Sequence, residues 1–127
     1  LDMMCGATYS TSLLAGVLRV GGSAMEEALR LLTDVPARFY GLRERGRVAV
    51  GSWADLVLFD PDRVDHGPER TVADLPGGAS RLYAEAVGIE RVLVNGVEVV
   101  NGGRLTGALS GTVLRSGRDT ESVTVRR

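Results

Sequence analysis

The spacing of the apolar residues changes from helical to strand-like near Gly46, and this change limits the chain to folds that contain both kinds of element. From Thr8 to about Gly41, apolar residues recur with the period of an amphipathic helix. From Arg47 onward they come in short β-rich runs separated by Gly, Pro, Asn and Asp. The sequence therefore predicts an α+β chain with its helices first and its strands second.

Two helices are expected at the start of the chain. The segment "YSTSLLAGVLR" at 9–19 carries one apolar face, and Gly21 and Gly22 are expected to stop it. Ser23 is followed three residues later by Glu26, the spacing of a capping box in which the hydroxyl and the carboxylate satisfy free N–H groups reciprocally. A second helix is therefore predicted to begin there.

Pro36 is expected to end this second helix near Thr33, because proline disfavours helical geometry in the residue before it. Asp34 would then cap a short further helix that ends at Gly41. Arg38 is expected to pair with a carboxylate inside this helical elbow.

The strand signals are strongest in two places. The run "ADLVLFD" at 54–60 is continuously apolar, which favours a strand buried on both faces. The segment "ERVLVNGVEVVNGG" at 90–103 alternates on either side of Asn95-Gly96, a dipeptide typical of type I′ turns, and predicts a β-hairpin. Weaker strands are expected at 112–115 and 122–126. Residues 66–88 are expected to form an irregular excursion, with one helical turn around Ser80 to Glu85.

The charges are nearly balanced, because 15 basic residues, all of them arginines, stand against 16 acidic ones. Such a balance gives no one-sided field of the kind that attracts nucleic acid or an anionic membrane. No apolar stretch approaches the roughly 20 residues that cross a bilayer. The single cysteine, Cys5, cannot form an internal disulfide, so a reducing, cytoplasmic compartment is expected. We therefore expect no nucleic-acid partner and no membrane partner.

Three segments together resemble the C-terminal end of amidohydrolase-superfamily enzymes. They are "LLTDVPARFYGL" at 31–42, "RERGRVAVGSWADLVLFD" at 43–60 and "GIERVLVNGVEVVNGGRLTG" at 88–107. The opening "LDMMCGATYSTSLLAG" and the tail "TGALSGTVLRSG" narrow the resemblance to the N-acyl-D-amino-acid deacylase (D-aminoacylase) branch. The chain also begins at Leu1 in apolar sequence, from which we expect it to be part of a longer polypeptide.

The resemblance implies an α+β fragment of a larger enzyme. Residues 1–45 would be the C-terminal loop and last helices of a (β/α)8 metal-dependent hydrolase barrel, and residues 46–127 would be the C-terminal strands of its small β-sandwich domain. In the full-length enzyme a zinc ion would lower the pKa of a bound water to roughly 7. The family's histidine ligands and catalytic acid match no position here, since that acid precedes the segment matching Leu1 and Asp2. We therefore expect no catalytic residue, no metal ligand and no zinc bound to this chain alone.

The residues expected nearest to the substrate lie in the loop that the resemblance places after the eighth barrel strand. They are Asp2, Cys5, Thr8 and Tyr9. Cys5 would either line the mouth of the active site or be a buried thiol. The other three would either touch the substrate and the groups around it or form a local turn or cap.

Other polar and aromatic residues are expected to be structural. His66 precedes Gly67 and has no partner ligands at metal-site spacing, so we interpret it as an exposed loop residue. Asp55 and Asp60 bracket the predicted strand, and their odd spacing puts them on opposite faces of it. Asp55 is interpreted as a turn-forming or capping acid. Trp53 is expected to cover the seam between sandwich and barrel.

The resulting hypothesis is that the chain is the C-terminal part of a zinc-dependent amidohydrolase that cleaves the amide bond of N-acyl-D-amino acids and is inactive without the rest. Its expected partners are the missing N-terminal part of the same polypeptide and a small-molecule N-acyl amino acid. Alone, the chain is expected to self-associate, because strand edges and an apolar face would lack their partners. The alternative is a non-catalytic, β-rich assembly module that uses these strands for oligomerisation.

Overall fold

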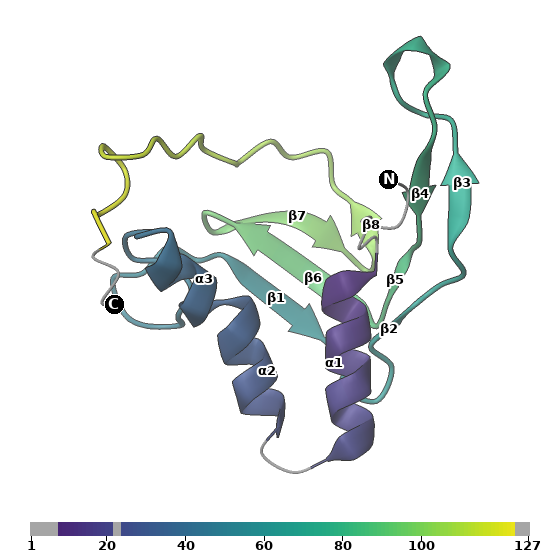
Figure 1. Cartoon of the computed structure of the whole chain (residues 1–127), viewed down its shortest axis with the longest axis horizontal. Helices are drawn as coiled ribbons and strands as arrows, with labels where there is room; N and C mark the ends of the chain where they lie inside the picture. Colours follow the sequence, from purple (N-terminus) through teal and green to yellow (C-terminus); the bar gives the residue numbers. More distant parts are fainter. Residues whose placement is uncertain (1–7, 22–23, 124–127) are drawn as a thin grey trace.

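The computed structural model describes residues 8–21 and 24–123 (Figure 1). Three helices come first, namely α1 (Tyr9–Val20), α2 (Ala24–Leu32) and α3 (Asp34–Phe39). The strands follow as β1 (Leu56–Phe59), β2 (Asp65–His66), β3 (Arg70–Val72), β4 (Arg81–Tyr83), β5 (Ala86–Val87), β6 (Ile89–Val94), β7 (Val97–Asn101) and β8 (Arg104–Leu105), with a short 3-10 turn, η2 (Pro76–Gly78), between β3 and β4. The predicted α+β class, with helices before strands, is confirmed.

The first helix ends where the sequence predicts. Gly21 follows α1 with a φ of 74°, in the left-handed region that glycine adopts without strain. The capping box predicted for the second helix includes Ser23, which lies outside the described residues. Within residues 8–21 and 24–123, none of the helices has the length and apolar character needed to cross a bilayer.

The junction between α2 and α3 differs from the prediction at Asp34. Thr33 holds the N-cap position of α3, and its hydroxyl donates a hydrogen bond to the carbonyl oxygen of Leu29 at 2.7 Å. Asp34 is already the first residue of α3, and its carboxylate accepts a hydrogen bond from Nε of Arg38 at 3.0 Å. The helix tolerates Pro36 because an N–H in the first turn has no helical partner to lose. The expected pairing of Arg38 with a carboxylate is therefore confirmed, whereas Asp34 as a cap is wrong.

A four-stranded antiparallel sheet in the order β1-β6-β7-β8 forms the centre of the molecule. The hairpin of β6 and β7 turns at Asn95 and Gly96, whose φ values of 51° and 80° are both positive, as a type I′ turn requires. The predicted hairpin is confirmed. Such a turn matches the right-handed twist of the two strands and sets the register beside it, and the pairing shifts by a bulge between Val92 and Leu93.

β1 lies at an edge of this sheet, and the exposure of its side chains contradicts the expected burial on both faces. Among the described strands, β1 pairs with β6 alone. The side chains of Val57 and Leu58 are 56% and 57% exposed. A continuous apolar run is typical of a strand with a layer on each side, and the described residues do not supply both layers.

The excursion between β1 and β6 is a ribbon of paired strands and not an irregular loop. β2 pairs with β5, and further out β3 pairs with β4, in the register Arg70↔Tyr83 and Val72↔Arg81. Figure 1 shows β3 and β4 standing away from the sheet as a separate arm. The helical turn expected around Ser80 to Glu85 is wrong. The guanidinium group of Arg70, on β3, lies 5.3 Å from the ring centroid of Tyr83 across the pair of strands, and that of Arg81, on the same strand as Tyr83, lies 5.1 Å from it. The contact with Arg70 favours the extended pairing.

The C-terminal segment after β8 crosses the molecule without regular structure (Figure 1). The strand expected at 112–115 is wrong. The one expected at 122–126 is not formed at 122–123, and its other residues lie outside the described part. The segment returns to the helical end of the molecule, where Leu42 and Thr120 form an isolated bridge and the N–H of Glu121 donates to the carbonyl oxygen of Gly41 at 2.8 Å.

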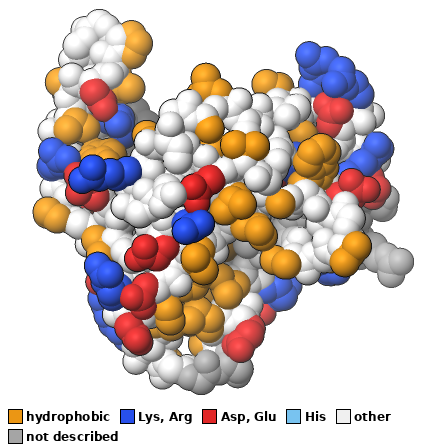
Figure 2. Space-filling model, turned by 180° about the vertical axis from the view of Figure 1, so that it is seen from behind, with side chains coloured by type: hydrophobic (Ala, Val, Ile, Leu, Met, Phe, Trp, Pro, Cys, Tyr) orange, Lys and Arg blue, Asp and Glu red, His pale blue; other side chains and the backbone are white. Residues whose placement is uncertain are grey.

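The hydrophobic core of the described residues is small. It consists of Leu14, Ala15, Ala28, Ala37 and Val64, and no side chain in residues 8–21 and 24–123 is less than 2% exposed. Figure 2 shows hydrophobic side chains clustered and exposed on one face of the molecule. A folded chain of this size normally buries about two thirds of the surface that it exposes when unfolded. The helices and the sheet therefore leave much of their apolar surface uncovered.

Candidate functional site

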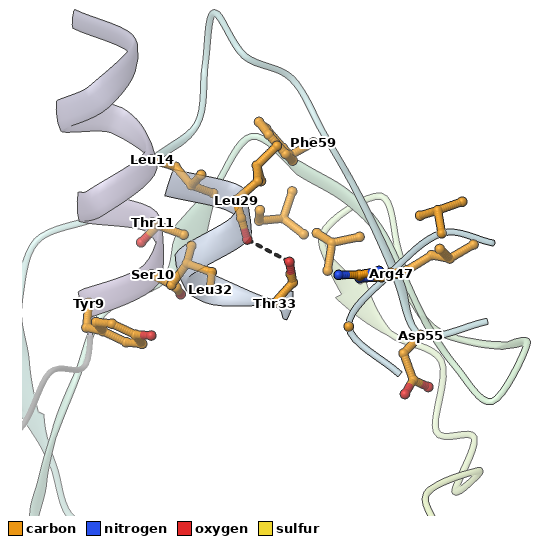
Figure 3. A pocket seen from close by; sticks show the side chains of 15 residues that line it. Tyr9, Ser10, Thr11, Leu14, Leu29, Leu32, Thr33, Arg47, Asp55 and Phe59 are labelled. Carbon is orange, nitrogen blue, oxygen red and sulfur yellow. Dashed lines mark hydrogen bonds between the residues drawn. The ribbon is translucent and has the colours of Figure 1, made fainter. Parts of the chain in front are cut away.

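An apolar hollow of about 540 Å³ lies where the helices face the sheet (Figure 3). Its walls come from α1, α2, β1, the start of β6 and the loop before β1. Leu14, Leu29, Leu32, Val48, Leu56, Val57, Phe59 and Ile89 supply the apolar lining, and Tyr9, Ser10, Thr11, Thr33, Gly46, Arg47 and Asp55 complete it. This volume lies within the range of small-molecule sites. The hollow is open, however, and most of its wall is aliphatic.

The four residues expected nearest to the substrate are not all placed. Asp2 and Cys5 lie outside the described residues. The carbonyl oxygen of Thr8 accepts hydrogen bonds from the N–H of Ser12 at 2.8 Å and from the hydroxyl of Thr11 at 3.2 Å, so Thr8 takes part in starting α1. Tyr9 is 63% exposed and lines the hollow. The predicted role of Thr8 in a local turn or cap is therefore seen at the start of α1. A contact of Thr8 or Tyr9 with a substrate stays a prediction.

A polar cluster of three residues joins the loop before β1 to the hairpin turn. One Oδ of Asp55 accepts from the N–H of Asn95 at 2.8 Å, and the other pairs with Nη1 of Arg45. Nη2 of Arg45 donates to Oδ1 of Asn95 at 2.8 Å, and this closes the triangle. The N–H of Gly96 donates to the carbonyl oxygen of Ala54 at 2.9 Å. The interpretation of Asp55 as a turn-forming acid is confirmed, since it holds the turn of a hairpin 40 residues later in the chain.

Arg45 is the member of this cluster that the sequence did not indicate. Its side chain is only 12% exposed, and its guanidinium group also lies 5.0 Å from the ring centroid of Trp53. A nearly buried guanidinium is stable only when its N–H groups find acceptors, and Asp55 and Asn95 provide them. Trp53 itself is half exposed, so the expected cover over a seam with a barrel stays a prediction.

The amide of Asn95 also reaches the C-terminal segment. Its Nδ2 donates to the carbonyl oxygen of Ser110 at 2.7 Å and lies 3.3 Å from the hydroxyl of Thr112. The tripeptides Ala-Asp-Leu at 54–56 and Val-Asn-Gly at 94–96, from the two strand segments that the sequence analysis singled out, are thus the two halves of one clamp. These two tripeptides hold the hairpin in place. The one carboxylate in them, that of Asp55, is fully engaged in hydrogen bonds within the chain.

A second pair of charges sits at the rim of the hollow. Arg47 donates to both carboxylate oxygens of Asp34, at 2.5 and 3.2 Å, and the Asp34 side chain is only 14% exposed. This bidentate pair ties the loop before β1 to α3. Like Asp55, Asp34 has its hydrogen-bonding capacity taken up within the chain.

His66 and Asp60 make local contacts with neighbouring residues. The Nδ1 of His66 is 2.9 Å from the carbonyl oxygen of Gly67, and the nearest carboxylate oxygen, that of Asp65, is 3.9 Å from its Nε2. An oxygen of Asp60 accepts the N–H of Asp62 at 2.9 Å in a turn. Among the residues that the structure describes, no three His, Cys, Asp or Glu side chains gather closely enough to hold a metal ion. The described residues therefore do not fit a zinc site.

Surface carboxyl groups show pKa shifts in one direction only. The groups concerned are Glu27, Asp65, Asp74 and Asp119, and each pKa lies below its ordinary value. The backbone N–H of His66 is the main cause at Asp65, and the hydrogen bond from Arg30 is the main cause at Glu27. A general acid that works at neutral pH needs a raised pKa. These four carboxyl groups consequently do not qualify.

The chain matches the model described as "Amidohydrolase family" over residues 10–100. This chain belongs to the amidohydrolase family. It is 48% identical to an N-acyl-D-glutamate deacylase of Alcaligenes xylosoxydans xylosoxydans over 75 residues, which are 59% of this chain and 14% of that protein. An N-acyl-D-aspartate deacylase from the same organism is 37% identical over 94 residues, covering 74% of this chain and 17% of that protein.

A D-aminoacylase of the same organism is also similar to this amidohydrolase chain, at 37% identity over 90 residues, which are 71% of this chain and 17% of that protein. No solved structure matches the chain. The matched part spans 14% to 17% of the length of these relatives. The resemblance to the N-acyl-D-amino-acid deacylase branch is thus confirmed, for a segment that corresponds to a small part of each relative.

Proposed function

We propose that this chain is the C-terminal part of a zinc-dependent hydrolase that cleaves the amide bond of N-acyl-D-amino acids with a metal-activated water. Residues 1–45 then belong to the loop and last helices of a (β/α)8 barrel, and residues 46–127 to its small β-sandwich domain. The observation that carries the proposal is the 48% identity to an N-acyl-D-glutamate deacylase over 75 residues. The family match over residues 10–100 supports the reaction class.

The chain's own contribution in this proposal is architectural. Because the described residues offer no set of metal ligands, zinc is held by residues elsewhere in the full-length protein. This chain alone does not hydrolyse the substrate. Its clamp of Arg45, Asp55 and Asn95 holds the hairpin against the loop that leaves the helices. The proposed surroundings are the cytoplasm, with the preceding part of the same polypeptide and a small-molecule substrate as partners and neither nucleic acid nor a membrane.

The test of the proposed function is a deacylase assay of the full-length gene product. N-acetyl-D-glutamate is the first substrate to try, followed by N-acetyl-D-aspartate and a neutral N-acetyl-D-amino acid, with the L-enantiomer of each as the matched control. We expect hydrolysis of a D-substrate that disappears after treatment with a chelator and returns on adding Zn²⁺. Absence of hydrolysis of all three D-substrates, in a protein containing stoichiometric zinc, contradicts the substrate class.

One observation favours the second candidate, a non-catalytic assembly module. The outer strand β1 presents Val57 and Leu58 to solvent, and exposed apolar strands at a sheet edge are typical of association surfaces. In that case the full-length protein binds no zinc, hydrolyses none of the substrates and forms an oligomer that is lost when these two side chains are replaced by charged ones.

A further inference from the structure

The two asparagines of this chain, Asn95 and Asn101, each stand between a valine and a glycine. Asn-Gly is the dipeptide in which an asparagine side chain deamidates most readily, because glycine has no Cβ to obstruct the approach of its own backbone nitrogen. With the same neighbours on both sides, the two asparagines should react at similar rates in an unfolded chain. A difference between them in the folded protein therefore comes from the structure.

Deamidation of an Asn-Gly dipeptide requires a defined movement of the asparagine side chain. The backbone nitrogen of the glycine attacks Cγ of the asparagine and gives up its proton, and a new C–N bond forms. The bond between Cγ and Nδ2 breaks, and the side-chain nitrogen leaves with that proton as ammonia. Water then opens the succinimide to aspartate or isoaspartate. The side chain must thus rotate over the next peptide unit, and the glycine N–H must leave its acceptor.

The folded structure opposes this movement at Asn95. Its Oδ1 accepts a hydrogen bond from Nη2 of Arg45 at 2.8 Å, and its Nδ2 donates to the carbonyl oxygen of Ser110 at 2.7 Å. The N–H of Gly96 donates to the carbonyl oxygen of Ala54 at 2.9 Å. Rotation of the side chain breaks the bonds at both ends of the amide and leaves the nearly buried guanidinium group of Arg45 with one acceptor fewer.

Asn101 is exposed at the end of β7, and its side chain is held less firmly. Among the hydrogen bonds between described residues, its amide makes one, from Nδ2 to a carboxylate oxygen of Glu98 on the same strand at 2.8 Å. The N–H of Gly102 donates to the carbonyl oxygen of Glu90 at 2.8 Å. This bond lies beside β8, a strand of two exposed residues, and hydrogen bonds at such an end of a sheet open locally at low cost.

We propose that Asn101 is a site of spontaneous deamidation in the folded protein, and that the clamp around Asn95 protects the second Asn-Gly dipeptide from the same reaction. The product at position 101 carries a negative charge where the amide donated to Glu98, so that two carboxylates face each other. The backbone oxygen of Glu98 also accepts the hydroxyl of Thr106 at 2.8 Å. The repulsion thus acts where β7, β8 and the C-terminal segment meet. This inference does not depend on the proposed function.

The experiment follows both asparagines in one sample of the full-length protein. The protein is kept in warm, mildly alkaline buffer, and samples taken over time are digested with pepsin in acid, which stops the reaction. Peptide mass spectrometry measures the mass gain at each asparagine and separates the isoaspartate product by retention. The same protein denatured in guanidinium chloride supplies the reference rate of each site, and circular dichroism verifies that the native sample is folded.

We expect Asn101 to react in the folded protein within about tenfold of its denatured rate, and Asn95 to react at least about a hundredfold more slowly than its own denatured rate. This comparison needs no substitution, because each site is the control for the other. Slower reaction at Asn101 than this range overturns its assignment. Equal protection of the two sites overturns the role of the clamp.

One substitution tests the clamp directly. Arg45→Ala removes the donor to Oδ1 of Asn95 and should accelerate deamidation there about tenfold or more, with the rate at Asn101 unchanged. The matched control is Arg70→Ala on the arm, which should change neither rate. If Arg45→Ala does not fold, Asp55→Asn takes its place, because it weakens the pairing that holds Arg45. An unchanged rate at Asn95 in the folded variant contradicts protection by the clamp.

The consequence of the modification is tested with Asn101→Asp, which carries the charge of the product, and with Asn101→Gln as its neutral control. The readout is amide hydrogen exchange at Thr106, whose N–H donates to the carbonyl oxygen of Val99 at 3.0 Å. Exchange in Asn101→Asp should be about threefold or more faster than in Asn101→Gln, because repulsion from Glu98 opens this end of the sheet. Equal exchange in the two variants contradicts the predicted repulsion.

Discussion

Asp55 and Arg45 join the loop before β1 to the turn of the β6–β7 hairpin through charged hydrogen bonds. One carboxylate oxygen of Asp55 accepts a hydrogen bond from the N–H of Asn95, and the other accepts one from Arg45. Arg45 also donates to the side-chain oxygen of Asn95. Because Arg45 is nearly buried, loss of its counter-charge leaves a guanidinium group with an incomplete set of acceptors. The energetic importance of the cluster thus exceeds that of the exposed ion pairs elsewhere on the surface.

The substitution Asp55→Asn tests this cluster. It keeps the shape and one acceptor oxygen but removes the charge, so we expect the free energy of unfolding to fall by about 1–2 kcal/mol. Urea denaturation of the 127-residue chain at fixed concentration measures the change. Trp53, the single tryptophan, supplies the fluorescence signal and stacks directly on Arg45.

The control is Asp74→Asn, the same chemical change in a carboxylate that pairs with Arg81 on the exposed arm of β3 and β4. It should cost less than about 0.5 kcal/mol, as is usual for surface ion pairs. Equal effects of the two substitutions would mean that the cluster around Asp55 is no more than a surface contact.

At the scale of elements, a charged contact joins α1 to β2. Nη2 of Arg19 lies 2.6 Å from an oxygen of Asp65, whose other oxygen accepts the N–H of His66 at 2.9 Å. These contacts, the N–H bond first, hold the pKa of Asp65 below its ordinary value. A carboxyl group whose pKa is lowered by folding stabilises the folded form above its unfolded pKa, and this stabilisation is lost as the pH falls through the folded value.

We therefore expect the junction of α1 and β2 to loosen in acid. Amide hydrogen exchange at His66, corrected for the intrinsic pH dependence, should be constant above about pH 5 and accelerate as the pH falls below about 4, the unfolded pKa of aspartate. In the variant Asp65→Asn the exchange should be fast throughout this range. A wild-type profile that coincides with that of the variant would show that the carboxylate does not hold the junction.

The elements also show which parts of the fold local sequence predicts. The turn at Asn95 and Gly96 and the stop at Gly21 follow from backbone conformations that these residues adopt readily, and both are found as predicted. The arm of β3 and β4 was not predicted because its pairing joins residues of two separate short strands, Arg70 opposite Tyr83 and Val72 opposite Arg81. Strands of three residues are too short for an alternation of apolar and polar side chains to predict such a pairing.

At the scale of the whole molecule, the small core and the open hollow show that much apolar surface of the described residues is exposed to solvent. Large hydrophobic side chains are exposed on every kind of element, including Phe39 on α3, Val57 on β1 and Leu109 in the C-terminal segment. The amidohydrolase relatives are several times longer than the matched segments. In the proposed full-length protein, additional chain covers part of this surface.

We therefore expect the isolated 127-residue chain to self-associate, driven by its exposed apolar surface and the unpaired edge of β1. Sedimentation velocity over a hundredfold range of concentration should show a rising mean mass. Replacing Val57 by Glu should shift association to higher concentration, and replacing the equally aliphatic Val113, outside the hollow, should change it less. A single monomeric species at all concentrations would contradict the expectation and weaken the need for a covering partner.

The sequence by itself determined the α+β order, the helix that ends at Gly21, the hairpin at Asn95-Gly96 and the family. These depend on backbone preferences and motifs that act within a few residues. Only the tertiary structure decided that β1 is an edge strand, that Arg45 completes the clamp between Asp55 and Asn95, and that α1, α2 and β1 enclose a hollow. The physical reason is that such contacts join residues 40 and 50 positions apart, where chain closure and the presence of covering layers, not local propensity, select the partner.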